Sequence, residues 1–140
     1  MKQTFSKHLI AIMLFTISVG FSACGSDDDN NELPTPSEKA STALAGTYKG
    51  TMTTYPGSKE FYDVILTVTE IKDGKVRITT DKGNVTPKEM VVKWNSDKYI
   101  MSASSDIGLL TYTMEEKVLD VGTNATQESD ITLSFRGVKQ

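Results

Sequence analysis

Short segments of alternating apolar and polar residues, separated by turn sequences, fill the C-terminal part of this chain. The clearest segment spans residues 62–69, and its apolar face is made of Tyr62, Val64, Leu66 and Val68. An Asp73-Gly74 pair follows, which is the strongest short-range signal for a β-hairpin. The return segment, 76–80, alternates in the same way. Because a period of two residues is the period of a strand, these segments predict paired antiparallel strands.

The same pattern recurs along the whole region from residue 44 to residue 140. We expect eight strands, at residues 46–55, 62–69, 76–80, 90–94, 99–103, 107–113, 117–122 and 130–138. Elsewhere in this region, only residues 86–90 and 114–117 could form a helical turn. Eight short strands in up-and-down order can close into a barrel, and closure removes exposed strand edges. The sequence therefore predicts an all-β fold, a small eight-stranded antiparallel up-and-down barrel.

The N-terminal segment has the features of a cleaved secretory signal. Lys2 and Lys7 give it a positive start, and residues 9–19 form an apolar run of 11 residues. That length suits a signal-peptide core and is short of the roughly 20 residues that a membrane-spanning helix needs. The small residues Ser22 and Ala23 stand directly before Cys24. We therefore expect residues 1–23 to be removed.

This arrangement resembles the lipobox of bacterial lipoproteins. The resemblance implies that Cys24 becomes the first residue of the mature protein and carries several acyl chains, palmitate among them. Two or three acyl chains make attachment to a membrane effectively permanent. The alternative is a buried cysteine beside an ordinary cleavage site.

Residues 24–43 are predicted to be a flexible acidic linker, because segments with so few large apolar residues cannot offset the entropy of becoming ordered. The segment that follows the cysteine resembles the surface-export signal of Bacteroidota lipoproteins. Its four residues are Ser26, Asp27, Asp28 and Asp29. The resemblance implies an outer-membrane protein that faces the cell exterior. The alternatives are the periplasmic face of that membrane and a run of acids that is only a solvated linker.

Composition excludes several classes of function. Removing residues 1–23 deletes two of the 15 basic residues and none of the 18 acidic ones, which leaves a balance of 13 to 18, or −5. An acidic domain without a basic stripe lacks the main electrostatic term of nucleic-acid binding. The single histidine, His8, lies in the signal, and the single cysteine is Cys24. The folded domain therefore has no imidazole base or thiol nucleophile and no histidine or cysteine metal ligand.

Only carboxylates remain as acid or base groups, and two pairs could be imagined as a glycosidase pair: Glu115 with Glu116, and Asp63 with Glu70. The first pair falls in an expected turn, where adjacent acids are usually solvated. We therefore expect no enzyme activity, no cofactor and no metal.

The two ends of the domain carry a further resemblance. Residues 45–51 (AGTYKGT) and 131–140 (ITLSFRGVKQ) are similar to the ends of the calycin-like β-barrel lipoproteins of Bacteroidota. This resemblance covers residues 44–140, and it implies a lipocalin-like barrel on a lipid anchor.

Inward aromatic and methionine side chains are the candidate ligand-lining residues of such a barrel. They are Tyr48, Tyr62, Trp94, Tyr99, Met101 and Phe135. They could line a pocket for an apolar ligand at the barrel mouth, or they could simply fill an interior that is just wide enough for side chains. The expected function is a non-catalytic binding module for a small apolar or glycan ligand. The alternative is a protein-interaction module, an inhibitor or an accessory subunit, that acts through its loops.

Overall fold

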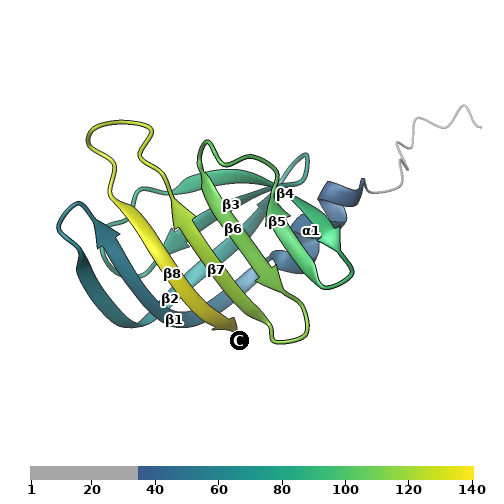
Figure 1. Cartoon of the computed structure of the whole chain (residues 1–140), viewed down its shortest axis with the longest axis horizontal. Helices are drawn as coiled ribbons and strands as arrows, with labels where there is room; N and C mark the ends of the chain where they lie inside the picture. The colour runs from purple at the N-terminus through teal and green to yellow at the C-terminus, as the bar shows by residue number, and fades with distance from the viewer. Residues whose placement is uncertain (1–34) are drawn as a thin grey trace, which may run out of the picture. The chain divides into compact units, whose positions relative to one another are not determined.

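The computed structural model describes residues 35–140, which form one helix and eight β-strands (Figure 1). The expected signal, Cys24, Ser26 and the acidic run Asp27 to Asp29 lie outside these residues. The elements are α1 (Pro36–Leu44), β1 (Gly46–Tyr55), β2 (Lys59–Ile71), β3 (Lys75–Thr80), β4 (Lys88–Ser96), β5 (Tyr99–Ser102), β6 (Gly108–Thr113), β7 (Val118–Thr123) and β8 (Thr132–Lys139).

The strands form a closed antiparallel barrel in sequence order, β1 to β8, which confirms the predicted fold class. Every strand pairs with its neighbour in the chain, and β8 returns to pair with β1 from Tyr48↔Lys139 to Tyr55↔Thr132. The expected strand positions agree with the observed ones to within a few residues. Because the sheet closes on itself, each strand has a hydrogen-bonded partner on both sides.

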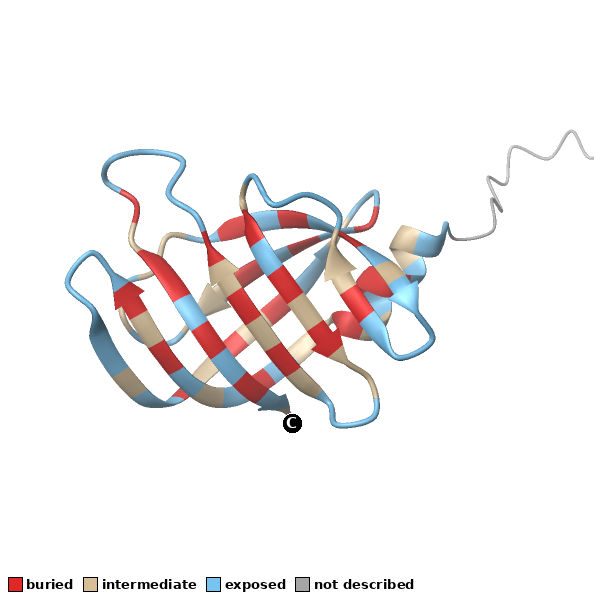
Figure 2. Cartoon of the chain, in the orientation of Figure 1, coloured by how far each residue is buried: buried red, intermediate tan, exposed pale blue. Residues whose placement is uncertain are grey.

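The barrel interior is filled by side chains. Buried and exposed residues alternate along the strands (Figure 2), as the sequence pattern predicts. The buried apolar residues of the barrel and the helix form one cluster, which includes Tyr48, Tyr112, Phe135, Leu44, Met52 and Ile100. An eight-stranded barrel is just wide enough for such a packed interior.

Helix α1 lies within the segment that the composition predicts to be a flexible linker. The linker prediction is wrong for residues 36–43, because the helix has a complete N-terminal cap. The hydroxyl of Thr35 accepts a hydrogen bond from the Glu38 amide at 3.2 Å, and the Glu38 carboxylate accepts one from the Thr35 amide at 2.6 Å. Pro36 occupies the first helical position, where its missing N–H is not needed.

Side chains of α1 attach the helix to the barrel. Ala40 and Leu44, one helical turn apart, are fully buried in the core. Ser41 and Thr42 both donate hydrogen bonds to the Glu70 carboxylate on β2, at 2.8 and 2.9 Å. Since α1 packs against β2, β3 and β4, it closes the barrel end where β1 begins and β8 finishes. We call the other end, with the β1–β2, β3–β4, β5–β6 and β7–β8 loops, the barrel mouth.

Candidate functional site

Three of the six predicted ligand-lining residues lie inside the barrel, and they take part in the core. Tyr48 is fully buried near α1, where its hydroxyl donates a hydrogen bond to the Leu44 carbonyl at 2.5 Å. Phe135 is 3% exposed, and Trp94 is partly buried against the core. These side chains fill the interior, which is the second of the two roles considered for them.

Tyr62 lies on the outer surface and is 65% exposed, so its predicted inward position is wrong. The cause is a bulge in β2. Three residues of β1, from Gly50 to Met52, lie opposite four residues of β2, from Phe61 to Val64, and Asp63 within this step has a φ of 50°. The extra residue reverses the alternation before Val64. Phe61 therefore packs against the core in place of Tyr62.

A second register shift reverses the faces of β5. It lies between Trp94 and Ser96 of β4, and it places Ile100 beside Trp94 on the inner face. Ile100 is fully buried, while Tyr99 is 40% exposed and Met101 is partly exposed. The predicted inward positions of Tyr99 and Met101 are therefore wrong.

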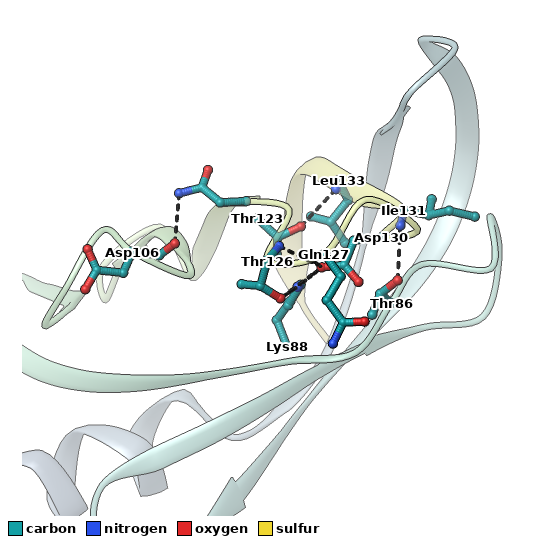
Figure 3. A network of polar contacts seen from close by, with 10 residues as sticks. Thr86, Lys88, Asp106, Thr123, Thr126, Gln127, Asp130, Ile131 and Leu133 are labelled. Carbon is teal, nitrogen blue, oxygen red and sulfur yellow. Dashed lines mark hydrogen bonds and ion pairs between the residues drawn. The ribbon is translucent and has the colours of Figure 1, made fainter.

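A buried ion pair lies at the barrel mouth (Figure 3). Lys88 shares the inner face of β4 with Met90 and Val92, and its ammonium donates hydrogen bonds to Asp130 Oδ2 at 2.5 Å and to Thr126 Oγ1 at 2.8 Å. The side chains of Lys88 and Asp130 are each only 6% exposed. This pair joins the inner face of β4 to the β7–β8 loop.

The β7–β8 loop, residues 124–131, also bonds to two other loops of the mouth. Ile131 exchanges two hydrogen bonds with Thr86 of the β3–β4 loop, each 3.0 Å long. The Asn124 side chain donates to the carbonyls of Ser105 and Asp106 in the β5–β6 loop, at 2.8 and 3.3 Å. Hydrogen bonds to β4, to the β3–β4 loop and to the β5–β6 loop thus hold the β7–β8 loop across the mouth.

The pKa of Asp130 lies well below its usual value, because Lys88 and the amides and hydroxyl of the loop bond to its charged form. The Lys88 ammonium contributes most, followed by the Thr126 amide. Sequence reasoning missed this pair. A signal was present, since Lys88 is in phase with Met90 and Val92 and therefore faces the interior.

We expect the Asp130–Lys88 pair to make thermal stability depend on pH in the acid range. The pKa of Asp130 is lower in the folded state than the value of about 3.9 in an unfolded chain. The contribution of ionised Asp130 to the free energy of unfolding is therefore complete above about pH 4, and it is lost as the pH falls toward and through the folded-state pKa. Asp130→Asn should lower Tm most at pH 7, and the Tm difference from the wild type should shrink below about pH 4. Melting curves recorded from about pH 2.5 to 7 measure this difference.

The matched control replaces both partners with apolar residues, as Lys88→Met with Asp130→Leu. Removing both charges avoids a buried ion without a partner, so this variant should be more stable at pH 7 than Asp130→Asn. A Tm difference between Asp130→Asn and the wild type that stayed constant over the whole pH range would contradict the assignment.

Next to the β7–β8 loop, the mouth contains a hollow of about 490 Å³, which we call the mouth hollow. Its side chains are those of Thr54, Pro56, Lys59, Phe61, Asn84 and Ile131. The Lys59 ammonium lies 5.2 Å from the centre of the Phe61 ring. Because Ile131 is fixed by Thr86, one wall of the hollow is held in place by the loop bonds described above.

Within residues 35–140, no group of three or more histidine, cysteine, aspartate or glutamate residues could hold a metal ion. Glu115 and Glu116 lie exposed in the β6–β7 turn, and Asp63 pairs with Lys49 at 3.0 Å. No helix in this part of the chain is long and apolar enough to cross a membrane. The mouth hollow is a candidate site for a small molecule, because its volume lies in the range of about 300 to 1,000 Å³ that ligand pockets occupy.

Comparison of the chain with protein-family models, with curated proteins and with solved structures finds no match in any of the three.

Proposed function

We propose that this protein is a non-catalytic binding module that holds a small apolar ligand in the mouth hollow. The observation that carries the proposal is the composition of the hollow: Phe61, Pro56 and Ile131 give it apolar walls, and Thr54, Asn84 and Lys59 add a few polar groups. Pockets for small molecules combine these two features. Because the core side chains fill the barrel, the ligand lies at the mouth and does not enter the interior.

We further propose that the barrel is attached to the outer membrane through lipid on Cys24 and faces the cell exterior. The lipobox-like residues before Cys24 and the acidic residues Asp27 to Asp29 support this proposal. The eight-stranded up-and-down barrel supports it as well, since this is the architecture that the resemblance to calycin-like lipoproteins implies.

Binding to the mouth hollow is tested with N-phenyl-1-naphthylamine, an apolar probe whose fluorescence rises when it leaves water. The Cys24→Ser chain is used, so that no detergent competes for the probe. We expect saturable binding that Ile131→Trp weakens by about tenfold or more, because the indole fills the hollow and a tenfold loss requires only about 1.4 kcal/mol.

The matched control is Val138→Trp, which adds the same indole at an exposed position of β8, the strand that follows Ile131. It should leave the probe affinity unchanged. Equal affinities for wild type and Ile131→Trp would show that the probe does not occupy the mouth hollow and would contradict the proposal.

We expect Cys24→Ser to move the protein from the membrane fraction to the soluble fraction. The reason is that two or three acyl chains hold a protein at a membrane effectively without release, whereas no segment of residues 35–140 provides a membrane-spanning helix. Fractionation followed by immunoblotting measures the shift, and mass spectrometry of the wild-type N-terminus should show a triacylated Cys24. A mature chain that began at Gly25, or an unmodified Cys24, would contradict the proposed anchor.

A further inference from the structure

The outer face of the barrel carries a second concave region, separate from the barrel mouth. Two hollows, of about 400 and about 290 Å³, adjoin across β7 and β8 and share Asp120 and Ser134. Together they form what we call the wall trough, defined by Thr51, Thr53, Tyr62, Gly122, Ser134 and Arg136. A closed barrel wall is ordinarily convex, so a continuous depression across it needs a cause in the side chains.

Small side chains form the floor of the wall trough. Thr53, Ser134 and Gly122 are cross-strand partners on β1, β8 and β7. The same row continues to Glu60 of β2 and to Leu109 of β6. Since neighbouring strands lie about 4.8 Å apart, these five strands give the row a length of about 19 Å. The trough is therefore long and narrow, and it runs across the strands.

Gly122 is not required by the barrel itself. A Cβ atom added there would find the Leu133 carbonyl oxygen, 3.9 Å away, as its nearest neighbour. By contrast, a Cβ on Gly50 or Gly108 would lie 2.0 or 2.2 Å from a backbone oxygen. Glycine inside a strand costs stability relative to alanine. At Gly122 the missing side chain leaves space in the trough and does not relieve any clash.

The walls and ends of the trough present exposed groups of mixed chemistry. Tyr62 is 65% exposed at one end, and its hydroxyl donates a hydrogen bond to Glu60 at 2.9 Å, which orients the ring. Leu109 is 64% exposed at the other end. Along the side, Arg136 donates to both carboxylate oxygens of Asp120, at 3.0 and 2.9 Å.

We infer that the wall trough binds an extended neutral oligosaccharide. Each sugar hydroxyl is both a donor and an acceptor, and the trough offers carboxylate acceptors, guanidinium donors and the hydroxyls of Thr51, Thr53 and Ser134. The exposed Tyr62 ring supplies an apolar surface with a polar edge. The Arg136 charge is balanced by Asp120, so nothing in the trough selects an anion.

A peptide strand fits the trough less well than a sugar chain. Peptides that bind sheets in extended form use main-chain hydrogen bonds to an open sheet edge, and this barrel is closed. A peptide lying across the strands would leave its own amides and carbonyls facing side chains that are too few to satisfy them. Sugar hydroxyls can rotate to meet the side chains that are present.

The test measures binding of unsubstituted neutral hexasaccharides of glucose, mannose and xylose to the full-length protein by isothermal titration calorimetry. The protein is held in a detergent without a sugar headgroup. At least one hexasaccharide should bind, and Gly122→Val and Tyr62→Ala should each weaken that binding by about tenfold or more. The valine fills the floor at a position where the backbone has room for it, so its Tm should not fall below that of the wild type.

The matched control is Tyr99→Ala, which removes another partly exposed tyrosine from the outer wall, on β5. It should change affinity by less than about twofold. Absence of binding by every hexasaccharide at millimolar concentration would overturn the inference. Unchanged affinity in both Gly122→Val and Tyr62→Ala would overturn it too, as would an extended peptide or a second copy of the chain occupying the trough instead. Because neither variant touches Ile131, this test and that of the mouth hollow can fail separately.

Discussion

A chain truncated after Asp130 should fail to fold. The truncation removes β8, which carries the buried side chains Leu133 and Phe135 and pairs with both β1 and β7. Each of these side chains contributes roughly 1.5 to 3 kcal/mol by burial, against a total stability of about 5 to 15 kcal/mol for a domain. The loss also opens the barrel, so that β1 and β7 become unpaired edges. The combined effect exceeds what the remaining strands can support.

Far-ultraviolet circular dichroism and a thermal melt measure the result. We expect the truncated chain to lose its β signal and its cooperative transition. A chain lacking only Gln140, which is exposed at the C-terminus, is the matched control and should melt close to the wild type. A cooperative melt in the chain ending at Asp130 would show that seven strands suffice for the fold.

Gly50→Ala should lower the stability of the barrel more than a methyl group added at any other position of β1. Gly50 pairs with Gly137 of β8, and an added Cβ would lie 2.0 Å from the Arg136 carbonyl oxygen and 2.5 Å from the Gly137 Cα. Backbone atoms cannot move aside as a flexible side chain can, so β1 and β8 would have to separate. We expect a loss of about 3 kcal/mol, at the upper end of overpacking costs, and a fall in Tm of more than about 10 °C.

Gly122→Ala is the matched control for this prediction, because it adds the same methyl group to a strand glycine with an open surrounding. It should raise stability by about 0.5 kcal/mol, as alanine generally does over glycine in a strand. Urea titration of both variants gives the two free energies of unfolding. Equal stabilities for Gly50→Ala and Gly122→Ala would show that the β1–β8 contact is not as close as the structure places it.

Alternation and turn signals were enough to predict the barrel. Val64, Leu66 and Val68 on β2, and Leu119 and Val121 on β7, are buried as their spacing indicates. The helix was not predicted, because α1 has few apolar residues and the residues around it are polar, which is the composition of a flexible linker. Its signal was a local one, since Thr35-Pro36-Ser37-Glu38 matches the capping box with proline at the first helical position.

The candidate site was less predictable than the fold. A β-bulge reverses the face of every residue beyond it, and neither Asp63 nor Asn95, between Trp94 and Ser96, marks its bulge in the sequence. Strand β5 is apolar on both faces, with Ile100 on one and Tyr99 on the other, so its periodicity does not show which face points inward. The mouth hollow joins loop residues from three parts of the chain, and that proximity depends on barrel closure.

The position of α1 determines the end of the barrel at which the chain enters. Ser37, near the start of the helix, packs against Gly74 in the β2–β3 turn, and Lys139 near the C-terminus donates a hydrogen bond to the Ala43 carbonyl at 2.7 Å. The chain therefore enters the barrel at the end opposite the mouth. Under the proposed lipid anchor on Cys24, the tether joins the barrel at its closed end, and the mouth hollow lies at the opposite end. The proposed ligand would then reach the mouth hollow from the side of the barrel that is away from the tether.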